Sequence, residues 1–359
     1  MSLFISFIYF IKIFFMKQKI DVVFYYPKHF NRGEDNQNLF FKPLFESCKK
    51  YNISYLVFEE PDRKSDKKEH RNSIPFDFPF YLIILLRKFG FRDKTSANIL
   101  SFLFLRNLKF KNVIVLSQSL IEFLRGLDKE AKIFDLQHGI IYSDKGSYIS
   151  DGKASSNISD NNVQLLLFGQ RFKEILDVSD KTNYYKKSTN VIGVQKSKCF
   201  RHFNPNRKVL ITLQFTDDHS VEQNLKMLNE IIIMVDSNED QDFYIRNHPR
   251  YNNCIDISEL EMKTNFAPES LMECFELCSI HVTSYSTTTF ECAEFGVPTV
   301  FLNSLKEEFN MFETDFKYPF DAEMIDVINN YAKYSDEVIS WRKEYYSDFD
   351  ERKFISFLR

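Results

Sequence analysis

The stretch IHVTSYSTTTFECAEFGVPTVFL, residues 280–302, decides the fold. Its first four residues have the composition of a buried strand, and residues 287–295 carry a helical pattern that Gly296 ends. Residues 299–302 again have the composition of a strand. A strand, a helix and a second strand in so short a segment predict a βαβ unit and therefore a parallel sheet.

The same alternation of strand and helix patterns extends from this segment toward both ends of the chain. Two successive α/β series predict an α/β fold with two Rossmann-like domains facing a cleft, because open parallel sheets bind ligands beyond the carboxyl ends of their strands. The predicted strands are residues 21–25, 54–58, 112–116, 131–136, 164–168, 209–214, 242–246, 280–283 and 299–302, and the predicted helices are residues 39–50, 120–127, 221–236, 270–278 and 287–295.

The length of 359 residues suits two domains, since one domain typically has about 150 residues. We predict a first domain over residues 16–190, a polar linker over residues 191–206, and a second domain with C-terminal helices over residues 207–359. Residues 1–15 form an apolar extension. It is too short for a span of about 20 residues and lacks a small-residue cleavage site, so it is either an upstream start-site artefact or a membrane-associating segment.

Composition excludes some partners. The formal net charge of -3 gives no electrostatic basis for nucleic-acid binding. The six cysteines form no Cys-x-x-Cys pair, which indicates free thiols in a reducing compartment and predicts a cytoplasmic protein, with association with the inner membrane face if the extension binds lipid.

The loop after residue 283 is the strongest candidate for a binding site. The hydroxyls of Ser284, Ser286 and Thr287 and unpaired backbone N–H groups stand where a helix begins, and such a position favours a phosphate. Glu291, one turn into the helix, is placed to accept hydrogen bonds from ribose hydroxyls. The alternative is that Ser286 or Thr287 only caps the helix.

Histidines follow two other predicted strands. Pro249 is expected to hold His248 in an extended conformation at the carboxyl edge of the second sheet. There His248 is a candidate phosphate ligand or general acid, with charge from Arg246 or Arg250. His138, after the strand at residues 131–136, is expected to face His248 across the cleft and to act as the general base for an acceptor hydroxyl. For both histidines an ordinary turn position is the alternative.

The loop after residues 209–214 supplies two further candidates. This loop resembles the first loop of the C-terminal domain of GT-B enzymes, which implies that Thr216 approaches a diphosphate. Asp217 is the second choice for the base after His138. The alternative is that neighbouring Asp218 and Ser220 only cap the helix from residue 221.

These motifs together resemble those of GT-B glycosyltransferases of the capsule and surface-polysaccharide type. Residues 284–298 look like the donor-site helix of that fold, and the resemblance implies that Ser286 and Thr287 contact phosphate and Glu291 holds the ribose. The strand followed by His248-Pro249 is similar to a step in bacterial sialyltransferases and teichoic-acid glycerophosphotransferases. Gln137-His138-Gly139 resembles the Gln-His-Gly of capsule sugar transferases. The double serine of sialyltransferases appears here as Ser-Tyr-Ser-Thr, which argues against a sialic-acid donor.

The resemblance implies transfer of a sugar from a nucleotide sugar, bound by the second domain, to a glycan or lipid-linked acceptor of capsule or lipopolysaccharide synthesis, bound by the first. No cofactor is expected, and His138 as base favours inversion. The two Asp-x-Asp triplets, residues 240–242 and 348–350, do not follow a strand, so we expect no metal. A sugar-nucleotide epimerase, a polyol-phosphate transferase and a non-catalytic assembly partner remain alternatives on the same fold.

Overall fold

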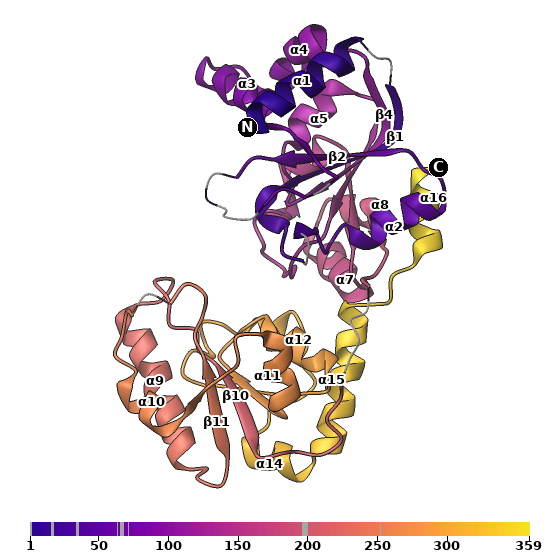
Figure 1. Cartoon of the computed structure of the whole chain (residues 1–359). Helices are drawn as coiled ribbons and strands as arrows, with labels where there is room; N and C mark the ends of the chain where they lie inside the picture. The colour runs from indigo at the N-terminus through magenta and orange to yellow at the C-terminus, as the bar shows by residue number, and fades with distance from the viewer. Residues whose placement is uncertain are drawn as a thin grey trace. The chain divides into compact units, whose positions relative to one another are not determined.

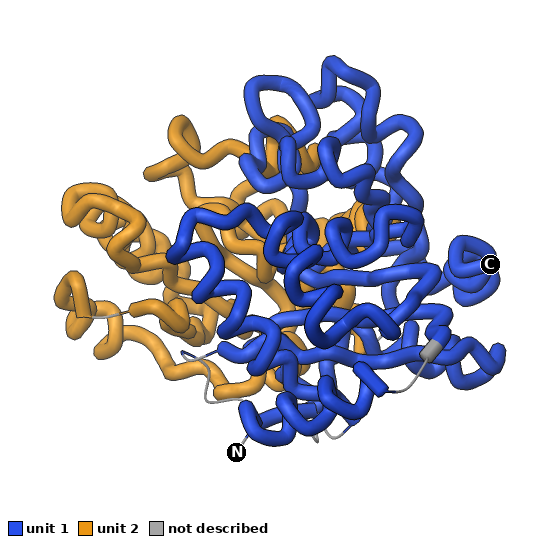
Figure 2. Tube along the Cα trace, turned by 90° about the horizontal axis from the view of Figure 1, so that it is seen from above, with its two compact units in different colours: residues 1–195, 346–359 blue, residues 196–345 orange. Residues whose placement is uncertain are grey.

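The computed structural model describes residues 2–15, 18–33, 36–62, 64, 68–70, 72–195, 200–251 and 253–359. The chain forms two compact units: unit 1 consists of residues 1–195 and 346–359, and unit 2 of residues 196–345 (Figure 2). Each unit has its own parallel sheet with helices around it, which confirms the predicted α/β class.

Unit 1 contains a seven-stranded sheet in the order β3-β2-β1-β4-β5-β8-β9. The chain adds β2 and β3 on one side of β1, then crosses to the other side for β4, so the switch point of the sheet lies between β1 and β4. The strands are β1 (Gln18–Pro27), β2 (Tyr55–Glu60), β3 (Ile74–Pro75), β4 (Leu108–Leu116), β5 (Lys132–Leu136), β8 (Val163–Leu167) and β9 (Thr189–Val191), with a hairpin of β6 (Ile149–Ser150) and β7 (Lys153–Ala154) beside them.

Helices cover this sheet because its central strands are apolar on both faces. In β1, residues 22–26 are all buried, as expected of a parallel strand. Phe24 packs edge-on against Phe45 of α2, with ring centroids 4.8 Å apart. The helices are α1 (Ser2–Phe15), α2 (Lys42–Lys50), α3 (Asp77–Lys88), α4 (Asp93–Leu100), α5 (Ile121–Leu127), α6 (Ser156–Ser159), α7 (Gln170–Ser179), α8 (Tyr184–Ser188) and α16 (Glu351–Leu358), with a 3-10 turn η1 (Lys28–Phe30) and a π-helical turn η3 (Ser101–Leu105).

The apolar extension forms α1, which packs on unit 1. Phe10 is fully buried against Phe58 of β2 and Phe76. Ser6 Oγ accepts the backbone N–H of Phe78 at 3.0 Å, at the start of α3. α1, α3 and α4 lie together at the top of Figure 1. Among the described residues, no helix is long and apolar enough to cross a membrane.

Unit 2 contains a five-stranded parallel sheet in the order β12-β11-β10-β13-β14, with its switch point between β10 and β13. A capping box of Ser220 and Gln223 begins its longest amphipathic helix, α9. The strands are β10 (Lys208–Thr212), β11 (Asp242–Arg246), β12 (Asn265–Phe266), β13 (Ile280–Thr283) and β14 (Thr299–Phe301), and the helices are α9 (Val221–Asp236), α10 (Ser258–Lys263), α11 (Leu271–Leu277), α12 (Thr288–Glu294), α13 (Met311–Thr314), α14 (Met324–Asn329) and α15 (Tyr331–Tyr345).

The C-terminal residues 346–359 belong to unit 1, whereas the sequence pattern assigned them to the second domain. The backbone of Phe349 donates to Val194 at 3.0 Å, and α16 packs beside α2. Gly193, with φ of +78°, makes this return possible, since a Cβ there would lie 2.2 Å from the carbonyl oxygen of Asp348. An amphipathic helix pattern does not reveal which sheet the helix covers, so the sequence could not assign this segment.

The cysteines in the described part of the chain, Cys48, Cys254, Cys274, Cys278 and Cys292, are free thiols, as expected from their spacing. Cys199 lies outside the described residues.

Candidate functional site

In unit 2 the loops after β10 and β13 meet at the switch point of the sheet. Gln214, after β10, accepts the backbone N–H of Tyr285, after β13, at 2.9 Å. The Nε2 of His219 and the Tyr285 hydroxyl form a second bond between these loops. The carboxylate of Asp218 binds both terminal nitrogens of Arg250, which follows β11. Loops of three neighbouring strands are thus joined where open parallel sheets bind ligands.

His248 lies in this loop cluster, directly after β11. Its Nδ1 accepts the backbone N–H of Arg250 at 3.1 Å, so in the neutral ring Nε2 carries the proton. Partial burial, and then the charge of Arg250, lower the pKa of His248. The neutral ring therefore presents one N–H donor, which suits a phosphate oxygen.

The start of α12 holds three predicted residues. Ser286 Oγ accepts the backbone N–H of Thr288 at 3.2 Å, so Ser286 caps the first turn. Thr287 is exposed and makes no side-chain capping bond. Glu291 is also exposed, although desolvation by the surrounding protein, and then the nearby Glu294 carboxylate, raise its pKa. Thr287 and Glu291 are accessible to a ligand, whereas the Ser286 hydroxyl is partly engaged.

Three other predicted residues hold the unit together. Thr216 is buried, and its hydroxyl accepts the backbone N–H two residues later at 3.3 Å. Ser284 is buried, with its Oγ 3.2 Å from the sulfur of Met227 in α9. Arg246 donates to the backbone carbonyl of Pro268 at 2.6 Å. Asp217, by contrast, is exposed on the loop after β10.

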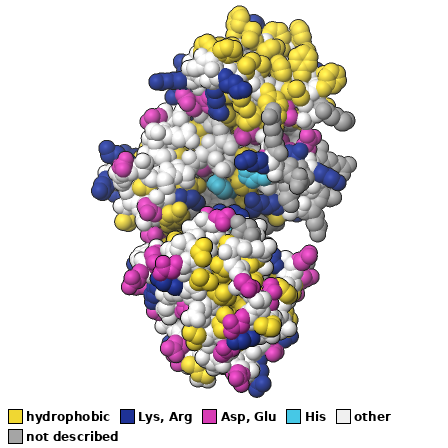
Figure 3. Space-filling view, turned by 90° about the vertical axis from the view of Figure 1, so that its left-hand side faces the viewer, with side chains coloured by type: hydrophobic (Ala, Val, Ile, Leu, Met, Phe, Trp, Pro, Cys, Tyr) yellow, Lys and Arg dark blue, Asp and Glu magenta, His cyan; other side chains and the backbone are white. Residues whose placement is uncertain are grey.

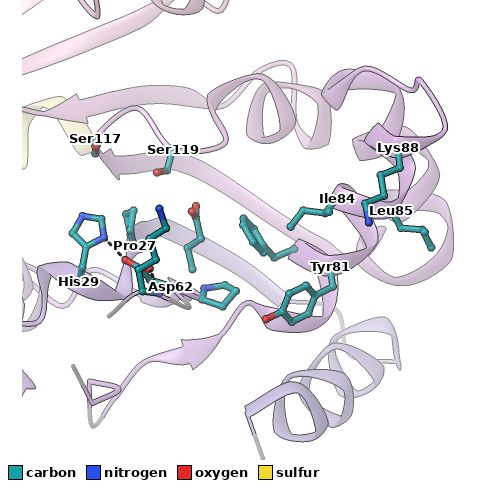
Figure 4. Close-up of a pocket in the computed structure, with 13 residues that line it drawn as sticks. Pro27, His29, Asp62, Tyr81, Ile84, Leu85, Lys88, Ser117 and Ser119 are labelled. Atoms are coloured by element: carbon teal, nitrogen blue, oxygen red, sulfur yellow. Dashed lines mark hydrogen bonds and ion pairs between the residues drawn. The ribbon is translucent and has the colours of Figure 1, made fainter. Parts of the chain in front are cut away.

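In unit 1 a cavity of about 730 Å³ lies at the switch point between β1 and β4. We call it the switch-point pocket. Loops after β1, β2 and β4 line one end of it and α3 lines the other (Figure 4). The lining residues are Pro27, His29, Glu60, Pro61, Asp62, Lys64, Phe80, Tyr81, Ile84, Leu85, Lys88, Ser117 and Ser119.

A histidine–carboxylate pair stands in this pocket. His29 Nδ1 lies 2.7 Å from Oδ2 of Asp62, and Figure 4 shows the bond between them. Burial alone would raise the pKa of Asp62, but hydrogen bonds from the Lys64 backbone and from His29 outweigh it and lower that pKa. An ionised Asp62 holds the His29 proton on Nδ1, which leaves Nε2 to accept a proton from a ligand.

The sequence did not single out His29 and Asp62. The available signal was that each follows a predicted strand within a few polar residues. Which strands flank the switch point depends on the order of strands in the sheet, and a single sequence does not give that order.

His138 lies one strand further from the switch point, after β5. Its ring packs edge-on against Phe30, and its Nδ1 is buried with no hydrogen-bond partner among the described residues. Burial, followed by the charges of Lys145, His29 and Arg32, lowers its pKa to about 4. His138 is therefore neutral near pH 7 and a weak base in this state.

A strained turn follows β4 at the edge of the pocket. Ser117, Gln118 and Leu120 have φ of +62°, +54° and +50°, which side chains rarely adopt. The turn is held by buried Asp135 of β5, whose Oδ1 accepts the Gln118 N–H at 3.0 Å. Burial raises the pKa of Asp135 to about 7. Asp135 thus supports the turn and does not orient His138.

Metal ligation has no visible basis in the described ranges, since no group of three His, Cys, Asp or Glu side chains there could hold an ion.

Comparison with known proteins identifies the fold. No family model matches the chain, and no curated protein matches its sequence. Among solved structures, a putative UDP-N-acetylglucosamine 2-epimerase from Listeria monocytogenes is similar with a TM-score of 0.53 and 13% identity, covering 94% of this chain and 95% of that one. The UDP-GlcNAc 2-epimerase from Neisseria meningitidis bound to UDP-GlcNAc gives a TM-score of 0.51 and 11% identity, covering 95% of this chain and 98% of that one. The glycosyltransferase SnogD from Streptomyces nogalater gives 0.51 and 12%, with 95% and 99% covered. The chain therefore has the GT-B fold.

Proposed function

We propose that this protein is a glycosyltransferase that moves a sugar from a nucleotide sugar to a glycan or lipid-linked acceptor of surface polysaccharide, without a metal and with inversion. One observation carries the proposal: each of the two sheets has its reactive side chains at its own switch point. Ligands of open parallel sheets bind at such points. Solved GT-B structures of similar fold include a glycosyltransferase and an epimerase bound to UDP-GlcNAc.

Unit 2 is the proposed donor site. The Nε2–H of His248 and the guanidinium of Arg250 supply donors for a diphosphate. Thr287, at the start of α12, adds a hydroxyl, and Glu291 would accept hydrogen bonds from the ribose. Thr216, Ser284, Ser286 and Arg246 then act mainly by shaping the loops, and exposed Asp217 remains the further candidate base.

Unit 1 is the proposed acceptor side, and its switch-point pocket has room for one sugar or a phosphate group. We assign the base to His29, because Asp62 orients its ring and stabilises the imidazolium that forms. The acceptor oxygen bonds to the sugar C1 as its proton passes to Nε2 of His29, and the bond between C1 and the phosphate oxygen breaks to release the nucleotide. His138 is the second candidate for the base.

An epimerase would act on the nucleotide sugar alone and would have no use for a second substrate. A pocket with its own histidine–carboxylate pair in unit 1 favours the transferase.

The donor site is tested by thermal unfolding of the full chain with UDP, CDP, CMP, GDP and ADP. A nucleotide held at about 100 times its Kd should stabilise the folded state by about 2.7 kcal/mol. Glu291→Ala should remove the shift, whereas Glu276→Ala, also exposed and on the neighbouring α11, should keep it. If no nucleotide shifts the transition, the donor site is refuted and a non-catalytic role is favoured.

A further inference from the structure

One surface of unit 1 exposes large apolar side chains in an unusual concentration. They come from α1, from the end of α3 with the loop that follows it, and from η3. Phe4 is 66% exposed, Phe89 72% and Phe102 75%. We call this surface the α1–α3 face, and its other members include Leu3, Phe15, Phe91 and Leu103.

These elements form one continuous surface. α1 packs beside both α3 and η3. Within the face, Phe78 of α3 contacts Phe7 of α1 and Phe104 of η3, with ring centroids 5.0 Å and 5.1 Å apart. Figure 3 shows the resulting apolar patch at the top of the molecule, where Figure 1 places α1, α3 and α4. Apolar patches of this kind mark binding surfaces.

The charges around the face are mainly positive. Residues 2–15 and 77–106 contain six basic side chains and two acidic ones. Of the acidic pair, Asp77 is buried and Asp93 is bound by Arg87 at 2.6 Å. An apolar centre with a basic surround fits a partner that is apolar within and anionic at its surface.

We propose that the α1–α3 face docks on the surface of a lipid bilayer that carries anionic headgroups. α1 has 14 residues and is therefore about 21 Å long at about 1.5 Å per residue, less than a hydrocarbon core of about 30 Å. It lies along the interface and does not cross it. A second copy of the chain is a poorer occupant, because it would bring the same basic side chains together.

The face also leads to the switch-point pocket. Leu85 of α3 is 48% exposed and lines that pocket, together with Ile84 and Lys88 of the same helix. Resting on the proposed function, this continuity implies that the acceptor is lipid-linked: its lipid stays in the bilayer, and its polar head enters the pocket past α3.

The test is co-sedimentation of the full chain with vesicles of phosphatidylcholine, alone or mixed with phosphatidylglycerol. The chain should bind the mixed vesicles more tightly, and added salt should weaken binding. Replacing Phe89 and Phe102 together by Asp should weaken binding by about tenfold or more. The matched control is Phe203→Asp in unit 2, where the side chain is 76% exposed, and it should bind as the unchanged chain does.

Three outcomes would overturn the proposal. The chain binds neither kind of vesicle, or the control loses as much binding as the double variant. The third outcome is that the unchanged chain sediments as a dimer, the variant with Phe89 and Phe102 replaced by Asp sediments as a monomer, and neither binds lipid. That result would identify a second copy of the chain as the partner of the α1–α3 face. Because vesicle binding needs no nucleotide, these results leave the donor site to its own thermal test, and each proposal fails separately.

Discussion

The switch points of the two sheets differ in the burial of the polar groups that hold their loops and in the backbone conformation of those loops. In unit 2 the loops are tied by exposed hydrogen-bonded groups such as Asp218 and Arg250. In unit 1, fully buried Asp135 of the neighbouring strand β5 holds the turn after β4, in which Ser117, Gln118 and Leu120 have left-handed backbone. Perturbed ionisation and backbone strain both concentrate where proteins carry out chemistry. This difference is consistent with our proposal that unit 2 binds the nucleotide and unit 1 carries out proton transfer.

The largest expected effect separates the two histidines of unit 1. His29→Ala should lower kcat by about 10³-fold, equivalent to about 4 kcal/mol, because the oriented base is lost. His138→Ala should lower it by about tenfold at most, since the pocket is lined by His29. Both variants should bind nucleotide normally, as measured by calorimetry, because neither residue belongs to unit 2.

The reverse pattern, with His138→Ala the more damaged variant, would return the role of base to His138. The pH profile gives a second discrimination. The pKa of His138 is about 4, so a rate governed by its ionisation would decline only near that pH.

The next effect concerns stability. Burial raises the pKa of Asp135 from 3.8 to about 7, so the unfolded chain releases this proton at lower pH than the folded chain does. The contribution of protonated Asp135 to the stability of the folded chain is therefore fully present below pH 4 and is lost as the pH rises through 7. Asp135→Asn keeps an oxygen for the Gln118 N–H without the charge. Relative to the unchanged chain, the variant should gain about 3 kcal/mol of unfolding free energy between pH 5 and pH 8.

Urea unfolding of both proteins at the two pH values measures this gain. If the unfolding free energies of both proteins changed equally with pH, water or a cation would have to reach Asp135. The ionisation of Asp135 would then no longer distinguish the two switch points.

Local pattern was enough to predict most of the fold. Strands β11 and β13 and helix α9 begin and end where the sequence places them, because a polar loop or a capping residue marks each end. The two-residue β3 was missed because so short a run has no periodicity. The pairing of α16 with unit 1 was missed because burial partners are set by tertiary structure.

The candidate site was less predictable for the same reason. Arg250 and His248 follow a strand directly, so their place in the loop cluster of unit 2 could be inferred from the chain. The pair of His29 and Asp62 joins residues 33 positions apart, and only the strand order brings them into one pocket. The positive φ of Ser117 and Gln118 has no signal in the sequence, since neither is glycine or asparagine.

The smallest expected effect tests the unit 2 half of the comparison. Arg250→Ala removes a cation from the proposed diphosphate site and should raise the nucleotide Kd by about tenfold.

Arg201→Ala is the matched control, because Arg201 also bonds an exposed carboxylate, that of Asp336, at 2.6 Å. Arg201 lies near Gly296, which directly precedes β14. Strand β14 is at one edge of the sheet, and β10 and β13 separate it from β11, which Arg250 follows. Both variants lose an ion pair with an exposed carboxylate, which should shift their unfolding midpoints little. Arg201 also donates to buried Ser335 at 3.3 Å, so any larger shift is expected in the control. A raised nucleotide Kd in Arg250→Ala alone would indicate that the phosphates bind beside β11. Equal Kd values in both would mean that the tie between Asp218 and Arg250 serves only to join the loops, and that the nucleotide, if it binds, relies on α12.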